Sequence, residues 1–170
     1  VRIPCDAFSP SRKQKRVIKK NVDLKITAVS PVYSDEHYHL YQSYIEQKHR
    51  DGDMYPPSPE QYASFLLSDW GNTVFFEFRD GDNKLLAVSV CDILENGISA
   101  VYTFYDIDQP KRSLGVMAVL WQIEEAKNRD LPSVYLGYWI KECQKMSYKT
   151  DYRPLEMLID DHWVQTNTQD

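Results

Sequence analysis

The stretch AVYTFYDIDQPKRSLGVMAVLWQIEEAKNRDLPSVYLGYW, residues 100–139, decides the fold. Aromatic and β-branched residues fill its first part, which is typical of a strand over 98–106. Apolar residues then recur at a spacing of three and four from Leu114 to Ala126, which predicts a long helix that begins near Arg112. A short apolar run over 131–139 follows and predicts a buried strand. The stretch is therefore strand, helix, strand.

The rest of the chain adds helices before this stretch and a strand after it. Turns rich in Gly, Asp and Asn separate the runs 73–78, 85–94 and 98–106, which predicts a three-stranded antiparallel meander. The other predicted elements are a strand over 22–29, helices over 11–21, 35–50, 59–67 and 140–153, and a last strand over 153–159.

This order of elements resembles the fold of the GCN5-related N-acetyltransferases, an α+β fold in which helices flank a mixed, mainly antiparallel sheet. The resemblance implies that the strands over 98–106 and 131–139 splay apart beyond the helix from Arg112. A splay of this kind exposes strand backbone groups and a helix N-terminus to a ligand.

Acetyltransferases of that fold begin this helix with Gln/Arg-x-x-Gly-x-Gly/Ala, which binds the pyrophosphate of coenzyme A. Arg112 and Gly115 fit this pattern, whereas Met117 stands where the small residue is expected. A CoA-dependent N-acyltransferase is therefore kept only as an alternative.

Composition places the chain among soluble globular domains. It has 170 residues, 42% of them hydrophobic and 26% charged, and no apolar run approaches the roughly 20 residues that span a bilayer. Cys5, Cys91 and Cys143 are far apart and odd in number, which suits a reducing, cytoplasmic location. We expect no metal and no cofactor.

Charge is distributed unevenly. Residues 1–25 carry eight Lys and Arg against two Asp, although the whole chain has a net charge of −5. A basic run on an acidic domain is either a solvated segment or a nucleic-acid contact. Four further cations, Lys141, Lys145, Lys149 and Arg153, recur every four residues, which predicts a basic ridge along one face of a helix.

Four strings carry a closer resemblance. They are YQSYIEQKHRDGDMYPPSPEQYASFL (41–66), LLAVSVCDILENGISAVYTFYD (85–106), SLGVMAVLWQIEEAK (113–127) and VYLGYWIKECQKMSYKTDYRPLE (134–156). They resemble the bacterial aminoacyl-tRNA–protein transferases, the leucyltransferase branch of the arginyltransferase family. The resemblance extends over nearly the whole chain, from residue 1 to about 164.

The resemblance implies a leucyl group on tRNA as donor and a protein with N-terminal Asp or Glu as acceptor. It also implies that residues 1–21 are a basic remnant of an N-terminal domain whose cysteine-rich region is missing. We expect residues 22–164 to form the aminoacyl-transferase domain and residues 165–170 a C-terminal tail.

The reaction suggests where its residues lie. The donor ester is already activated, so the enzyme must mainly hold an unprotonated amine against the ester carbonyl. Backbone N–H groups would stabilise the carbonyl oxygen and a tyrosine would relay a proton to the leaving ribose oxygen. The catalytic candidates are Tyr102, Tyr105, Asp106, Leu114, Gly115 and Tyr138. Core packing of the tyrosines and a turn role for Asp106 are the structural alternatives.

Substrate binding is assigned to cations and their neighbours. An acidic acceptor side chain needs a cation at short range, whereas tRNA needs cations spread along its phosphates. The substrate-binding candidates are Lys145, Lys149, His49, Asp51 and Trp139, with a helix-end role as the alternative for His49 and Asp51. The tRNA-binding candidates are Arg12, Lys13, Lys15, Arg16, Lys19, Lys20, Lys111, Arg112 and Lys141. An arginyl donor and an inactive RNA-binding module remain alternative functions.

Overall fold

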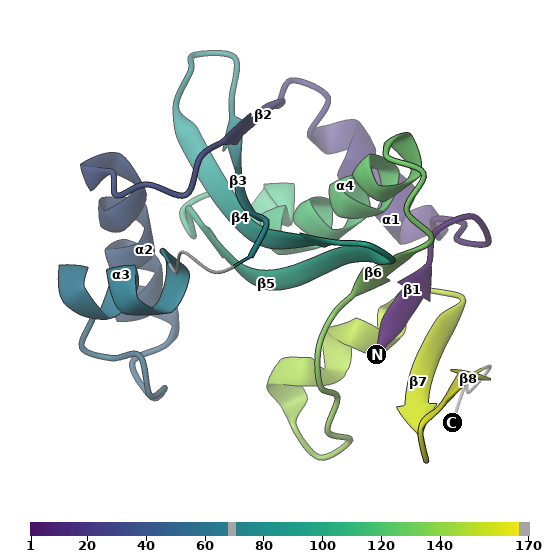
Figure 1. The fold of residues 1–170 in the computed structure, drawn as a ribbon. Coiled ribbons are helices and arrows are strands. Elements are labelled where there is room, and N and C mark those ends of the chain that lie inside the picture. Colours follow the sequence, from purple (N-terminus) through teal and green to yellow (C-terminus); the bar gives the residue numbers. More distant parts are fainter. Residues whose placement is uncertain (68–70, 167–170) are drawn as a thin grey trace.

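The computed structural model describes residues 1–67 and 71–166, which form a mixed sheet with helices on both faces (Figure 1). The strands are β1 (Arg2–Pro4), β2 (Lys25–Val29), β3 (Thr73–Arg79), β4 (Leu85–Leu94), β5 (Gly97–Tyr105), β6 (Ser133–Tyr135), β7 (Leu155–Ile159) and β8 (His162–Thr166). The helices are α1 (Arg12–Lys20), α2 (Asp35–Lys48), α3 (Pro59–Leu66) and α4 (Leu114–Asn128), with 3₁₀ segments η1 (Pro110–Arg112) and η2 (Gln144–Asp151).

The strand order is β2-β3-β4-β5-β6-β1-β7-β8, and among the described strands β5 and β6 form the one parallel pair. The predicted α+β class, the mainly antiparallel sheet and the central meander are confirmed. None of the helices in the two described ranges is long and apolar enough to cross a membrane.

Serine caps begin the first three helices. Ser11, Ser34 and Ser58 each accept a hydrogen bond from a backbone N–H in the first turn, which satisfies a donor that the helix itself leaves free. At α1 the side chain of Gln14 also bonds back to the Ser11 N–H, completing a capping box. These caps explain why the helix starts were readable from the sequence.

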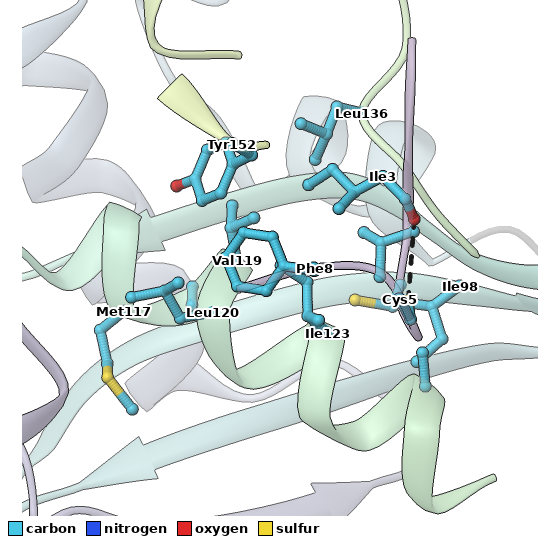
Figure 2. Close-up of a cluster of buried hydrophobic side chains, with 14 of the residues drawn as sticks. Ile3, Cys5, Phe8, Ile98, Met117, Val119, Leu120, Ile123, Leu136 and Tyr152 are labelled. Atoms are coloured by element: carbon cyan, nitrogen blue, oxygen red, sulfur yellow. Dashed lines mark hydrogen bonds between the residues drawn. The ribbon is translucent and has the colours of Figure 1, made fainter. Parts of the chain in front are cut away.

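The sheet separates two apolar clusters. On one face, α2 and α3 bury an aromatic cluster that includes Tyr41, Tyr62 and Phe75. On the other face, α4 packs with α1, and Leu120 and Ile123 of α4 meet Ile3 of β1 (Figures 1 and 2). The N-terminal residues therefore belong to the same sheet and core as the rest of the chain.

The predicted splay is present between β5 and β6. β5 and β6 pair through three residues, from Gly97–Ser133 to Ser99–Tyr135. β5 then continues to Tyr105 paired with β4 but no longer with β6. A bulge at Val101, where β4 pairing shifts register, bends β5 just beyond the last paired residue. A Cβ on Gly97 would lie 2.2 Å from the Ser133 carbonyl oxygen, so the close approach of the strands requires glycine here.

The helix predicted over 140–153 is wrong. Residues 136–140 form an irregular segment in which Gly137 has φ +78, and η2 follows with 3₁₀ geometry. With about three residues per turn, side chains four apart point to different faces, so no single basic ridge forms. Lys149 and Tyr152 turn inward and are buried. Their packing overrides the local preference for an α-helix.

Other differences concern short strands. β1 and β8 were not predicted because three to five residues with mixed polarity carry little pattern. The strands predicted over 22–29 and 131–139 are shorter than expected, because their pairing stops early. Of the predicted tail, Gln165 and Thr166 belong to β8, and residues 167–170 lie outside the described residues.

Candidate active site in the strand splay

A cavity of about 1160 Å³ opens where β5 leaves β6. Its walls are the second half of β5, the start of α4, the end of α2, and the segment that runs from β6 through η2. Its lining includes five of the six catalytic candidates and three of the five substrate-binding candidates. Those residues are Tyr102, Tyr105, Asp106, Leu114, Gly115, His49, Lys145 and Lys149 in the lining, with Asp51 paired at its edge.

Tyr105 of the cavity contacts both α2 and the start of α4. Its hydroxyl oxygen accepts a hydrogen bond from the Lys48 ammonium, which also lies over the ring at 4.6 Å from the centroid. Its ring lies 4.9 Å from that of Tyr44, centroid to centroid. Its edge also covers Gly115, where a Cβ would come within 3.2 Å of Tyr105 Cε1. Tyr105 is thus held between α2 and the start of α4.

The start of α4 presents free backbone donors. Ser113 is the N-cap, with left-handed backbone at φ 51, and its side chain makes no capping hydrogen bond. The first-turn N–H groups have no partner within a helix, and the helix dipole adds partial positive charge there. Leu114 and Gly115 line the cavity. Their N–H groups are suited to bind a carbonyl oxygen that gains negative charge.

Tyr102 and Asp106 occupy less reactive environments. Burial raises the pKa of Tyr102, with its neighbours Tyr41 and Tyr105 adding to the effect, so its hydroxyl stays protonated. The Asp106 carboxylate bonds to Lys84 Nζ at 2.8 Å and accepts the Asp108 N–H at 2.9 Å. Asp106 therefore serves the turn after β5, as the structural alternative anticipated.

Lys145 and Asp51, both predicted to bind substrate, bond to each other at 2.8 Å. The Lys145 ammonium lowers the pKa of the Asp51 carboxyl. His49 lies beside them, with its ring 4.8 Å from that of Tyr44. Burial lowers the pKa of His49, and the charges of Lys48 and Lys145 lower it further. His49 is therefore mostly neutral near pH 7 and can accept a proton.

Lys149 has the environment of an anion receptor. Its side chain is almost completely buried, at 8% exposure, and it lines the cavity. Its ammonium donates to the Tyr138 carbonyl, and within the described part of the chain no carboxylate pairs with it. Burial lowers its pKa because the charged form is poorly solvated. An anion that enters the cavity would relieve this cost.

Two candidates lie elsewhere. The side chain of Tyr138 is 86% exposed and does not line the cavity, so its predicted place in the splay is wrong. Trp139 also lies outside the lining and buries its indole N–H without a partner. Both follow β6, which ends at Tyr135, so the strand alternation that placed them does not extend to them.

The predicted tRNA-binding cations divide into exposed and paired groups. The exposed ones are Arg12, Lys13, Lys15, Arg16, Lys19 and Lys20 of α1, together with Lys111 and Lys141. Arg112 instead makes a two-fold bond to Asp23 at 2.8 and 2.9 Å. Arg112 is therefore engaged within the protein. The cations of α1 form the accessible basic surface.

Four cavity residues escaped the sequence analysis. Lys48 and Tyr44 lie on the helical face of α2 that also forms the core, so no motif marks them. Tyr148 lines the cavity rather than only packing η2 against the sheet. Gln122 of α4 has an amide that is buried with both polar atoms unpaired. A polar residue in an otherwise apolar helical face was the available signal for Gln122.

The splayed strands, the exposed helix N-terminus and the cavity between them define an acyltransferase of the GCN5-related fold. Consistent with this fold, the structure of L-PGS from Bacillus licheniformis superposes with a TM-score of 0.59, at 12% identity, over 82% of this chain and 47% of that one.

Residues 36–159 match the family model of the arginine-tRNA-protein transferase C terminus. Proteins called aspartate/glutamate leucyltransferase from Pseudomonas entomophila (strain L48) and Pseudomonas fluorescens (strain Pf0-1) are 55% and 57% identical to this chain. Each alignment covers 98% of this chain and 70% of the relative. The chain belongs to this family of aminoacyl-tRNA–protein transferases.

Proposed function

We propose that this chain transfers leucine from leucyl-tRNA to the α-amine of proteins that begin with Asp or Glu, in the cytoplasm. The names of the two Pseudomonas relatives support the donor and the acceptor. The environment of Lys149 supports an acidic acceptor. This lysine is nearly buried and lines the cavity, and it has no carboxylate partner in the described residues. The side chain of an N-terminal Asp or Glu supplies that carboxylate.

The transfer is a direct displacement. The nitrogen of the acceptor amine forms a bond to the ester carbonyl carbon, the carbon–oxygen bond to the ribose breaks, and the ribose oxygen takes a proton. N–H groups of Leu114 and Gly115 stabilise the carbonyl oxygen while it carries negative charge. Tyr105 gives the ribose oxygen its proton and is reprotonated by the proton that the nitrogen releases after its attack. Lys48 donates to the Tyr105 oxygen and leaves the O–H free to donate.

His49 accepts the proton that the amine must lose. A free α-amine has a pKa of about 8, so most of it is protonated near neutral pH. His49 lines the cavity, and its lowered pKa leaves the imidazole neutral under the same conditions. The ammonium of Lys145 beside it discourages protonation of the resting imidazole.

The cavity wall favours leucine over arginine as the transferred residue. Val116, Val119 and Leu136 form an apolar side next to the splay. A guanidinium would need a carboxylate, and of the two acidic residues in the lining Asp106 is already paired with Lys84 and Asp53 is exposed. An apolar side chain leaves no such group unsatisfied.

The test combines radiolabelled Leu-tRNA or Arg-tRNA with peptides that begin with Asp, Glu or Ala. We expect leucine on the two acidic peptides and little on the alanyl peptide. Equal transfer from Arg-tRNA would reject leucyl-tRNA as the specific donor. Equal transfer to the alanyl peptide would reject N-terminal Asp or Glu as the specific acceptor.

Lys149→Ala tests the acceptor site directly. Loss of a hydrogen bond between charged groups costs about 1.5–3 kcal/mol, so the preference for Asp over Ala should fall about 10- to 100-fold. Lys141→Ala, which removes an exposed lysine outside the lining, is the control and should keep the preference. An unchanged preference in Lys149→Ala would remove Lys149 from the acceptor site.

A further inference from the structure

A second, smaller cavity of about 300 Å³ lies between α1 and the start of α4. It shares Ser113, Val116 and Tyr148 with the large cavity, so the two are neighbours across a common wall. No step of the transfer uses this space. Its size is at the lower end of the range of about 300–1,000 Å³ for ligand pockets.

Tyr152 gives this small cavity an unsatisfied polar group. The residue is 1% exposed and lines the cavity, and its buried hydroxyl has no hydrogen-bond partner among the described residues. Its ring packs against Phe8 with centroids 6.3 Å apart, and Figure 2 shows the hydroxyl oxygen at the end of the ring that points away from Ile3 and Leu136. A buried hydroxyl without a partner destabilises the free protein, and a ligand that bonds to it removes this cost.

The other lining groups are of mixed charge. Lys13 and Asp151 contribute an ammonium and a carboxylate, and both residues are exposed at the rim. A site for a phosphate alone would not include a carboxylate. A nucleoside fits the mixture better, because its hydroxyl and amino groups donate to a carboxylate, while the phosphate that follows it needs a cation.

Tyr148 adds an aromatic surface at the boundary between the cavities. Its side chain is 43% exposed, and it lines both cavities. Exposed aromatic rings of this kind stack on nucleic-acid bases, with about 1–3 kcal/mol per base. The basic helix α1 forms one wall of the small cavity and carries exposed cations that can bind phosphates.

We propose that the small cavity binds the 3′-terminal nucleoside of the donor tRNA, with the aminoacyl ester extending past Tyr148 into the large cavity. This inference rests on the proposed function, because it assigns a place to the donor of that reaction. Tyr152 bonds to the nucleoside, Asp151 accepts from its hydroxyl or amino groups, and Lys13 meets the adjoining phosphate.

The test measures binding rather than transfer. Uncharged tRNA, intact or lacking its 3′-terminal nucleotide, is titrated into the full chain at one fixed salt concentration. We expect the wild-type chain to bind intact tRNA about ten-fold more tightly than tRNA that lacks the 3′-terminal nucleotide, as stacking and one hydrogen bond predict. Tyr152→Phe should reduce this ratio about five-fold by removing only the hydroxyl.

Tyr62→Phe is the matched control. Tyr62 also buries a hydroxyl without a partner, yet it lies in the aromatic cluster on the other face of the sheet and lines neither cavity. Both substitutions relieve an unsatisfied hydroxyl, so both should raise thermal stability. Tyr62→Phe should leave the ratio of the two tRNA affinities unchanged.

The outcomes separate the two proposals. If the wild type binds both tRNAs equally, or if Tyr152→Phe keeps the full ratio, the nucleoside site is rejected while the proposed function stands. If neither tRNA binds, the proposed function fails and this site fails with it. If inorganic phosphate abolishes the difference between the tRNAs and adenosine does not, the cavity is a phosphate site and the proposal is rejected.

Discussion

At the scale of single residues, the contact between Tyr105 and Gly115 organises the candidate active site. The ring of Tyr105 lies against the backbone of Gly115, which brings the phenol close to the exposed N–H groups of α4. A Cβ at position 115 would crowd the ring, at 3.2 Å from Tyr105 Cε1. Glycine therefore serves this site by allowing close packing, and its helical position requires no unusual backbone conformation.

Gly115→Ala should impair transfer more than folding. Its Cβ would lie 3.2 Å from Tyr105 Cε1, so the ring must move by a few tenths of an ångström, which disturbs the bond from Lys48. The higher helix propensity of alanine, about 1 kcal/mol, offsets much of the crowding. We expect a free energy of unfolding within about 1 kcal/mol of wild type and a fall in kcat of about ten-fold.

Urea denaturation and single-turnover transfer measure these two quantities for Gly115→Ala. Gly81→Ala is the control, because a Cβ there meets no atom within 4 Å and Gly81 lies in the distant turn between β3 and β4. A Gly115→Ala chain with wild-type kcat would show that the position of the Tyr105 ring does not matter for transfer.

At the scale of elements, a partly buried network of charged and hydrogen-bonded side chains ties α2 to the sheet. It thereby positions Lys48, at the end of α2, and His49, which follows it. His37 of α2 bonds to Glu77 of β3 at 2.6 Å, and Arg79 bonds to Glu77 at 2.9 Å and to Glu36 at 2.7 Å. Burial raises the pKa of Glu77, but the bonds from Arg79 and His37 outweigh it and hold the pKa below its ordinary value of 4.5.

Glu77→Gln tests whether this network makes the free energy of unfolding sensitive to acid. The folded state favours the ionised form of Glu77, so its contribution is complete above about pH 4.5 and is lost as pH falls through the lower pKa of the folded state. We expect Glu77→Gln to cost about 1–3 kcal/mol at pH 7 and progressively less below pH 4.5.

Urea titrations at pH 7, 5, 4 and 3 follow this difference. Glu124→Gln provides the control, since Glu124 is 63% exposed and pairs only with Lys127 at the surface. If the difference between wild type and Glu77→Gln stays constant across this pH range, the ionised carboxylate contributes nothing through the network.

At the scale of the whole molecule, positive charge is concentrated on α1 of an otherwise acidic protein. The six cations of α1 are exposed, and α1 packs against α4 and lines the small cavity. The rest of the chain is net negative and would repel nucleic acid elsewhere. This asymmetry favours one orientation of a bound tRNA.

Replacing Arg16, Lys19 and Lys20 together by Gln should weaken tRNA binding and reduce its dependence on salt. Each phosphate contact that is lost lowers the slope of log K against log salt by about 0.7–0.9, the values for single strands and for B-DNA. We therefore expect the slope to fall by about 2 to 3. Filter binding between 50 and 200 mM salt measures it.

The matched control replaces Lys25, Lys127 and Arg129, which removes the same charge from β2 and from the far end of α4. Both variants change net charge equally, so a general electrostatic effect would shift both slopes alike. Equal slopes in the two variants would reject α1 as the tRNA-binding surface.

The sequence by itself determined the class of fold and several residues of the cavity. Serine caps, helical spacing and the turns of the meander are local signals, and each reports on residues that lie close together along the chain. They placed Tyr102, Tyr105, Leu114 and Gly115 at the splay correctly, and the resemblance of whole strings indicated the family.

Only the tertiary structure decided which groups are available for chemistry. Lys145 and Lys149 are equivalent members of the four-residue repeat of cations. Lys145 nevertheless pairs with Asp51, whereas Lys149 is buried without a carboxylate partner in the described residues. That difference depends on segments almost a hundred residues apart meeting at η2, whose conformation follows from packing rather than from local preference. Burial and pairing are properties of the folded chain, and they set which cation can receive a substrate.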